Sequence, residues 1–174
     1  AGAWRVTGRM ERDGGGVAVL WIQLTLWRPN EYDVAEYTAM VVYFLEHMSK
    51  SIGETFCVVF DMAGWRVSHG LHLAKVHKLI TTLQDHYPER LRAALLIRTP
   101  GIFEASWRLI KPWIDPNTAQ KVHFLPRGAA EAAALLEFVD VAVLPAQYGG
   151  ALAPEALVVP GLPGEPNVEV VPAG

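Results

Sequence analysis

Short, continuously apolar runs alternate along the chain with longer segments in which apolar residues recur every three or four positions. A run that is apolar at every position is typical of an interior strand, because both faces of such a strand are buried. Recurrence at three and four positions instead predicts a helix with one apolar face. Strands are expected at residues 17–24, 55–61, 91–97 and 121–125. Helices are expected at residues 31–50, from Leu73 to Tyr87, at 102–114 and at 129–139.

This alternation predicts an α/β fold with a mostly parallel sheet flanked by helices. Residues 1–16 show no clear pattern and are expected to be irregular, ending in a glycine-rich turn. After residue 150 the composition changes to Pro, Gly, Ala and Val, so 151–174 are expected to form a Pro/Gly-rich tail beyond a domain at 1–150. The chain has neither an initiator Met nor a signal peptide, and we expect it to be a piece of a longer protein.

Composition narrows the classes of function. The formal net charge is −3 and no cluster of Lys and Arg stands out, which argues against nucleic acid as a partner. No apolar run approaches the roughly 20 residues that span a bilayer. The single cysteine, Cys57, cannot form an intrachain disulfide; its apolar surroundings predict a small buried hydrophobe and fit a reducing compartment.

An ordered series of short motifs carries a resemblance to a known family. The motifs are Asp61-Met62-Ala63-Gly64, Tyr87-Pro88-Glu89-Arg90-Leu91, Thr99-Pro100-Gly101-Ile102-Phe103, Ile110-Lys111-Pro112-Trp113-Ile114-Asp115 and Leu144-Pro145-Ala146-Gln147-Tyr148-Gly149-Gly150. In this order and spacing they resemble the CRAL-TRIO lipid-binding family, which includes the fungal phosphatidylinositol/phosphatidylcholine transfer proteins. The resemblance covers roughly residues 8–150. It implies a lobe that binds and exchanges one lipid in an apolar pocket behind a mobile amphipathic helix.

The chain departs from the family pattern in three respects. Arg98 stands where the family usually has Asn, and Gln147 replaces the usual acidic residue of the last motif. The small helical lobe that normally precedes the domain is absent from this sequence. Any ligand contact made from that lobe is therefore expected to be missing.

Residues 102–114 are the segment that the resemblance identifies as the gate helix. Its broad apolar face is built by Phe103, Trp107, Ile110, Trp113 and Ile114. From the pattern alone, an ordinary core helix is the commoner explanation of such a face. The resemblance instead implies that the helix swings to admit lipid, and two tryptophans suit contact with a membrane interface.

The resemblance also implies where a lipid headgroup binds. The residue types that contact phosphatidylinositol in the family are present at matching positions as Glu89, Thr118 and Lys121. Lys supplies charge to a phosphodiester, while Glu and Thr hydrogen-bond to hydroxyls. Members that bind phosphatidylcholine have two hydroxyl residues where this chain has Phe56 and Val58, two further expected pocket residues, so phosphatidylinositol is the expected ligand. The alternative is that Glu89 pairs with a neighbouring arginine and Lys121 is solvated.

Other candidate chemistry is weaker. Asp61 ends a strand and is expected to cap the turn that follows it, rather than serve as a catalytic or metal carboxylate. The spacing of His69, His72 and His77 does not place all three on one helical face, so no metal site is predicted. No nucleophile elbow, phosphate loop or zinc-protease motif is present, and neither catalysis nor a cofactor is expected.

The expected protein is therefore a cytoplasmic monomer that binds a phospholipid or another hydrophobic ligand and touches membranes transiently. Two further hypotheses remain open. The lobe could be a lipid-sensing module that targets a larger signalling or trafficking protein. It could also carry a small isoprenoid such as a tocopherol or retinoid, which would not need Lys121.

Overall fold

A computed structural model describes residues 4–12, 15–26, 30–31, 33–51 and 55–153. Its centre is a five-stranded sheet in which the spatial order of the strands follows the sequence. The strands are β1 (Trp4–Arg12), β2 (Gly15–Gln23), β3 (Thr55–Asp61), β4 (Leu91–Ile97) and β5 (Val122–Phe124). β1 pairs with β2 in an antiparallel manner, and the other neighbours are parallel, which confirms the mostly parallel sheet.

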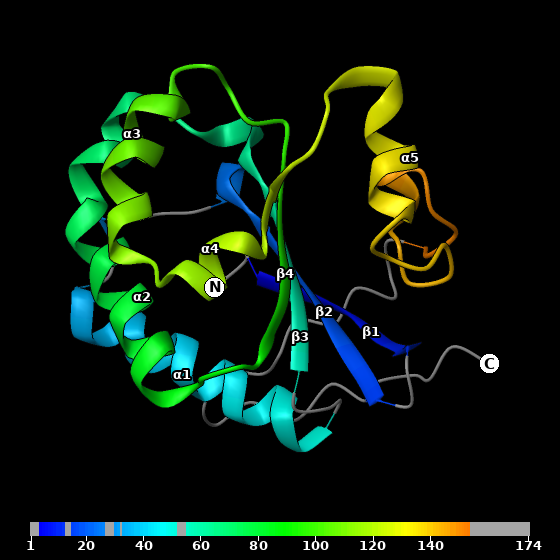
Figure 1. The fold of residues 1–174 in the computed structure, drawn as a ribbon, viewed down its shortest axis with the longest axis horizontal. Helices are drawn as coiled ribbons and strands as arrows, with labels where there is room; N and C mark the ends of the chain where they lie inside the picture. The colour runs from blue at the N-terminus through cyan, green and yellow to red at the C-terminus, as the bar shows by residue number, and fades with distance from the viewer. Residues whose placement is uncertain (1–3, 13–14, 27–29, 32, 52–54, 154–174) are drawn as a thin grey trace.

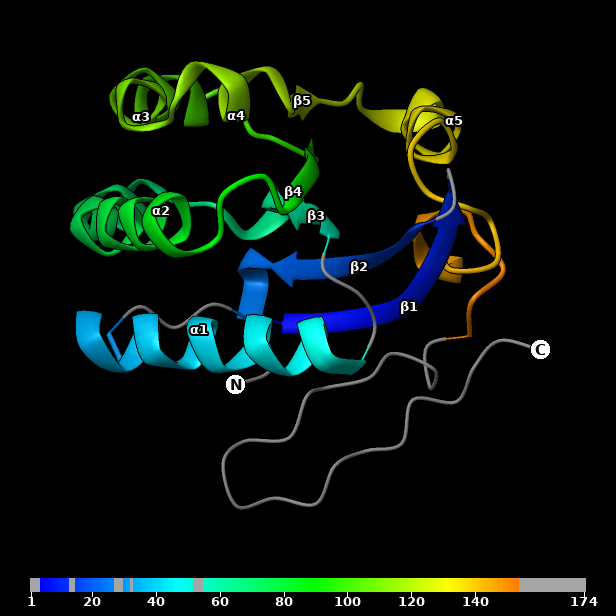
Figure 2. The ribbon, with the colours of Figure 1, turned by 60° about the horizontal axis from the view of Figure 1, so that its bottom comes forward.

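The helices lie on the two faces of this sheet. They are α1 (Val34–Ser51), α2 (Leu73–His86), α3 (Phe103–Ile110), α4 (Pro116–Gln120) and α5 (Glu131–Leu136). Parallel strands are joined by right-handed crossovers, so a sheet whose strands follow sequence order receives the crossover helices on one face. Figure 1 shows α1, α2 and α3 on one side of the sheet and α5 on the other, and Figure 2 shows the three crossover helices stacked in the order of the strands.

Alternation along the strands divides the core into two layers. Leu20, Val58 and Leu96 point to the face covered by α1, α2 and α3. Their sequence neighbours pack against α5 and the segment after it, with Trp21 and Leu95 among the most deeply buried. Side chains of successive residues in a strand point to opposite faces, so each run that is apolar throughout serves both layers.

Several predicted elements are confirmed, and others need correction. The strands at 55–61 and 91–97 and the helix from Leu73 occur as predicted. The irregular segment predicted at 1–16 is wrong, because β1 occupies most of it. In β1, Trp4, Val6 and Met10 alternate with polar residues, a period of two that is typical of a strand with two unlike faces. The predicted turn lies partly outside the described residues.

Helix boundaries also differ from the prediction, for local reasons. α1 begins at Val34 because Asp33 and Glu36 form a reciprocal capping pair, with each side chain accepting a hydrogen bond from the other's backbone N–H. The helix predicted at 102–114 is α-helical only to Ile110 and continues as a 3-10 turn at Lys111–Trp113, because Pro112 cannot extend the α-helical hydrogen bonding. The predicted tail lies outside the described residues from 154 onward.

In the described part of the chain, no helix is both long and apolar enough to cross a bilayer.

Candidate functional site

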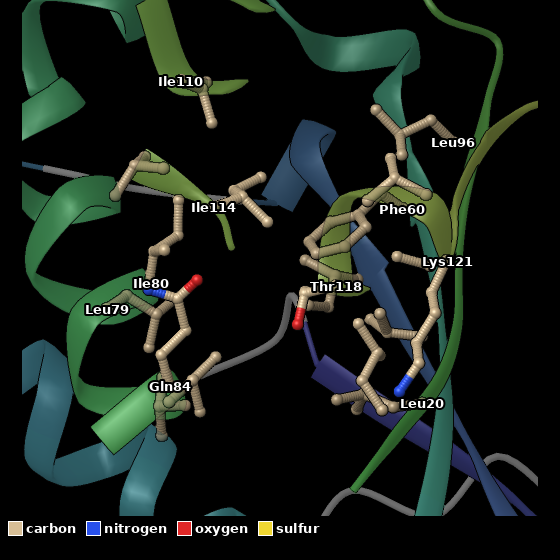
Figure 3. Close-up of a pocket in the computed structure, with 18 of the residues that line it drawn as sticks. Leu20, Phe60, Leu79, Ile80, Gln84, Leu96, Ile110, Ile114, Thr118 and Lys121 are labelled. Atoms are coloured by element: carbon tan, nitrogen blue, oxygen red, sulfur yellow. The ribbon is translucent and has the colours of Figure 1, made fainter. Parts of the chain in front are cut away.

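A cavity of about 490 Å³ lies between the sheet and the layer formed by α1, α2 and α3. Figure 3 shows Leu20, Phe60 and Leu96 on the sheet side, facing Ile80, Ile110 and Ile114 on the helix side. Most of the lining is aliphatic or aromatic. The other apolar lining residues are Ile22, Leu24, Tyr37, Val41, Leu45, Phe56, Val58, Met62, Trp65, Val76, Leu79, Leu83, Tyr87, Pro88, Leu91, Ala94, Phe103, Trp107 and Val122.

One end of the cavity is walled by aromatic rings. Phe103, the first residue of α3, packs edge-on against Trp65 with ring centroids 4.9 Å apart. Trp107, one turn later, packs edge-on against Phe124 of β5 at 5.1 Å. These contacts place the start of α3 against the carboxyl ends of the strands, so α3 forms one wall of the cavity.

The polar lining residues are Gln84, Glu89, Asp115, Thr118 and Lys121. The Lys121 ammonium nitrogen lies 3.4 Å from a Glu89 carboxylate oxygen. Glu89 has a φ of 59°, a left-handed conformation that is uncommon for a residue with a side chain and that clusters at functional sites. The structure thus brings together all three residues that the resemblance assigned to the headgroup.

α4, which contains Thr118 and is followed directly by Lys121, is held by Asp115. A carboxylate oxygen of Asp115 accepts hydrogen bonds from the backbone N–H groups of Asn117 and Thr118, each at 3.0 Å. Hydrogen bonds from Thr118, first through its side chain and then through its backbone, lower the pKa of Asp115. An ionised N-cap is favoured at the amino end of a helix, so α4 is fixed locally and not only by tertiary packing.

Of the predicted pocket and gate residues, Phe56, Val58, Phe103, Trp107, Ile110 and Ile114 line the cavity. Trp113 is not among the lining residues. Its ring packs edge-on against His77 of α2, with centroids 4.8 Å apart. The tighter 3-10 turn at Lys111–Trp113 rotates residue 113 away from the position that an uninterrupted α-helix would give it.

Gln84 is a site residue that the sequence analysis did not single out. Its side-chain amide donates to the carbonyl of Trp113 at 3.1 Å, and its carbonyl oxygen accepts from the N–H of Asp115 at 2.7 Å. The signal in the sequence was a glutamine one helical turn after Ile80, in a helix whose other cavity-lining residues are apolar. Gln84 fixes the connection between α3 and α4 to the end of α2.

A second polar cluster surrounds Asp61 at the carboxyl end of β3. The predicted turn cap is confirmed, since Asp61 accepts from the N–H of Ala63 at 3.1 Å. Its other carboxylate oxygen accepts from the Tyr148 hydroxyl at 2.7 Å and from Arg98 at 3.3 Å. Burial, followed by the hydrogen bond to Asp61, raises the pKa of Tyr148 well above its usual range. These contacts join residues far apart in the sequence.

The histidines make separate contacts. His69 is buried and accepts a hydrogen bond from the backbone N–H of Arg66 at 3.1 Å, and burial lowers its pKa. His77 packs against Trp113 as described above. Within the described residues, no three side chains of His, Cys, Asp or Glu are grouped so as to hold a metal ion.

Comparisons with known proteins agree with this architecture. The chain is 29% identical over 141 residues to "Phosphatidylinositol transfer protein CSR1" of Eremothecium gossypii, covering 79% of this chain and 31% of that protein. It is 35% identical over 121 residues to "SEC14 cytosolic factor" of Candida glabrata, covering 67% and 39%. The crystal structure of Sfh5 superimposes with a TM-score of 0.67 at 21% identity, covering 86% of this chain and 54% of that chain.

The chain therefore spans about two fifths or less of the length of these curated relatives. The likeness to Sfh5 supports the fold, in which a mostly parallel sheet is flanked by helices. The family described as CRAL/TRIO domain matches residues 5–150. This range contains the five described strands, except for Trp4 at the start of β1. This chain belongs to the CRAL/TRIO domain family.

Proposed function

We propose that residues 1–150 bind and exchange a single lipid, with phosphatidylinositol as the preferred ligand. The observation that carries the proposal is a cavity with a mostly apolar lining, whose polar residues are linked to one another by contacts from Gln84 through Asp115 and Thr118 to Lys121 and Glu89. Ligand sites of this kind bury an apolar body and orient it through a few polar groups. An amphiphile matches such a cavity, because its acyl part can replace missing packing while its headgroup stays with Glu89, Thr118 and Lys121.

The headgroup preference follows from the polar lining residues. Lys121 can offset the charge of a phosphodiester, and Thr118 and Glu89 can hydrogen-bond to ring hydroxyls. Phe56 and Val58 line the cavity and have no hydrogen-bonding side-chain group for a phosphate. A buried polar group that lacks a partner costs roughly 1–3 kcal/mol, and a charged group such as a phosphate costs more. An aromatic ring can still attract a choline cation, so weaker binding of phosphatidylcholine is expected rather than none.

We further propose that α3 is the element that moves to admit the lipid. It covers the cavity with Phe103 and Ile110, which are buried, while Ile102 and Leu109 expose 55% and 59% of their surface. Pro112 interrupts the helix near its end, and Gly101 precedes it with no atom near the position of an added Cβ. A helix with breaks on both sides can rotate as a unit.

Ligand-dependent stability tests the proposal. Phosphatidylinositol should raise the midpoint of thermal unfolding, because a ligand that binds only the native state stabilises it by mass action. Phosphatidylcholine should give a smaller shift. Ile80→Trp, which fills the cavity, should abolish both shifts, whereas Leu136→Trp on the opposite layer should keep them. Absence of any shift across a range of lipids, with no lipid found by mass spectrometry of the purified protein, would refute a lipid site.

A further inference from the structure

Arg98 occupies the junction between β4 and the segment that leads into α3. Its guanidinium contacts two carboxylates at once: Nη1 lies 3.3 Å from Asp61 and Nε lies 3.2 Å from Glu131. The guanidinium carbon also lies 4.9 Å from the centre of the Tyr148 ring. One side chain therefore connects the start of the α3 segment to β3, to α5 and to the segment after α5.

The groups that hold Arg98 form a buried platform. The Asp61 and Glu131 side chains expose only 7% and 11% of their surface, against 41% for Arg98. The Tyr148 hydroxyl, which donates to Asp61, also accepts from Gln23 at 3.2 Å. The Tyr148 ring stacks on Trp21 with centroids 4.7 Å apart. Because these partners are fixed by the layer opposite the cavity, Arg98 is anchored on the far side of the sheet from the ligand site.

The backbone beside this anchor carries two unfavourable features. Arg98 has a φ of 53°, in the left-handed region that residues with long side chains rarely adopt. The hydroxyl of the next residue, Thr99, is buried and finds no hydrogen-bond partner among the described residues. Strained backbone persists only where surrounding contacts hold it, and it clusters at active sites and at segments that change conformation. Buried polar groups without a partner are rare in native structures. Both features would be relieved by a rearrangement of residues 98–101.

We propose that Arg98 is a positioning residue, an ionic clamp that holds α3 over the cavity and sets the rate at which the cavity opens. Its contacts with Asp61, Glu131 and Tyr148 offset the unfavourable backbone of Arg98 and the unpaired hydroxyl of Thr99. Weakening the clamp shifts the balance toward the open arrangement without altering the polar lining residues of the cavity. The inference rests on the proposed function, because it assigns the gating of that same site.

The chain supplies a matched control for this clamp. Arg108 and Glu104 form a second Arg–Glu pair at 2.7 Å, on α3 itself, with side chains 74% and 70% exposed. An exposed ion pair of this kind contributes little to the stability of the folded state. The neutral variants Glu131→Gln and Arg98→Gln should therefore change the rate of lipid exchange. Glu104→Gln and Arg108→Gln remove the same charges and should leave that rate unchanged.

Two measurements test the clamp in the full chain. The first is the rate of transfer of labelled phosphatidylinositol between vesicles and the protein, together with the amount bound at saturation. Glu131→Gln and Arg98→Gln should speed uptake and release by about fivefold, as expected for the loss of a partly buried ionic contact, with the ratio of phosphatidylinositol to phosphatidylcholine bound unchanged. The two control variants should exchange lipid at the wild-type rate.

The second measurement is hydrogen exchange of backbone amides in lipid-free protein. The N–H groups of Phe103 and Glu104, bonded to the carbonyls of Pro100 and Gly101, should exchange faster in the clamp variants, while amides of α2 and β3 keep wild-type rates. Unchanged exchange at residues 103 and 104 in folded clamp variants would overturn the clamp. So would equal changes in the control variants. If wild type takes up no lipid, the proposed function fails, and the amide result alone decides whether Arg98 clamps α3.

Discussion

The ammonium nitrogen of Lys121 and a carboxylate oxygen of Glu89 lie 3.4 Å apart, although the residues are 32 positions apart in the chain. Glu89 is 80% exposed, while Lys121 is 27% exposed and lines the cavity. The Glu89 carboxylate is thus a partner of the Lys121 ammonium group. Under the proposed headgroup assignment, a bound phosphodiester would replace Glu89 as the partner of Lys121, and the Glu89 carboxylate would accept hydrogen bonds from ring hydroxyls.

Lys121→Ala is therefore expected to weaken binding of phosphatidylinositol by about tenfold, equivalent to roughly 1.4 kcal/mol, and to affect phosphatidylcholine less. Competition between the two labelled lipids measures this difference. Lys78→Ala, which removes an exposed lysine of α2, is the control for net charge. Equal uptake of both lipids by wild type, or normal uptake of phosphatidylinositol by Lys121→Ala, would show that the headgroup assignment is wrong.

Replacing Trp107 and Trp113 together by Ala should weaken association with liposomes and slow lipid uptake several-fold, since tryptophan favours the membrane interface. The single variants should differ, because Trp107 lines the cavity and Trp113 packs against His77. Sedimentation with liposomes and transfer kinetics provide the readout, and Leu136→Ala on the other layer is the control. A folded double variant with wild-type transfer rates would contradict the assignment of α3 as the gate.

Gln84→Met should reduce stability and phosphatidylinositol binding together. It removes two hydrogen bonds, each worth about 0.5–1.5 kcal/mol, that fix the connection between α3 and α4. Thermal unfolding and lipid binding measure the two effects. Gln120→Met makes the same chemical change at an exposed position of α4 and should leave both near wild type. Wild-type binding by Gln84→Met would show that Gln84 does not position the headgroup residues.

Gly150→Ala should destabilise the fold by about 2 kcal/mol or more, because an added Cβ would collide with the backbone carbonyl of Leu144. Gly101→Ala meets no atom within 4 Å and should change the free energy of unfolding by less than about 0.5 kcal/mol. Denaturant unfolding of both variants provides the comparison. A similar loss of stability in the two would show that the close approach at Gly150 is relieved by local movement.

The buried thiol of Cys57 should contribute to a loss of stability at alkaline pH. Burial raises its pKa from an ordinary value of 9.0 to about 12. Because the pKa is higher in the folded state, this contribution is fully present below pH 9 and is lost as pH rises toward 12. Cys57→Ala should therefore lose less stability than wild type between those values in denaturant unfolding. Parallel pH profiles for the two proteins would contradict this.

The parts of the fold that the sequence predicted well are those with strong local signals. The boundaries of β3, α2 and β4 follow from dense apolar runs and from proline and glycine punctuation. β1 was missed because Trp4, Val6 and Met10 are few and lie among arginines, and because pairing on one side only leaves a weaker pattern. The break at Pro112 was visible in the sequence, yet its effect on the direction of Trp113 depends on the turn that actually forms.

The residues of the candidate site also fall into those that the sequence predicted and those that it did not. Among the apolar lining residues, Ile110 follows from the helical spacing of its segment, and Phe56 follows from the position that the family resemblance assigns to it. Contacts made by single polar side chains across the fold do not, because Asp61 and Tyr148 are 87 positions apart and Gln84 and Asp115 are 31 apart. Such pairs form because crossovers place the ends of different strands side by side, and a local sequence pattern cannot predict that placement.

The sequential order of the strands has a consequence for how the chain is made. After β2, each crossover adds the next strand at the same edge of the sheet. The elements that line the cavity therefore leave the ribosome in the order in which they lie side by side in the fold. The sheet face of β2 and β3 and the helices α1 and α2 emerge first, with their apolar residues uncovered on one side. α3 and the turn with Thr118 and Lys121 follow them, before β5 and α5. In a nascent chain, one apolar side of the cavity would therefore stay uncovered until residue 122 has left the ribosome, and exposed apolar surface of this kind favours aggregation or chaperone binding.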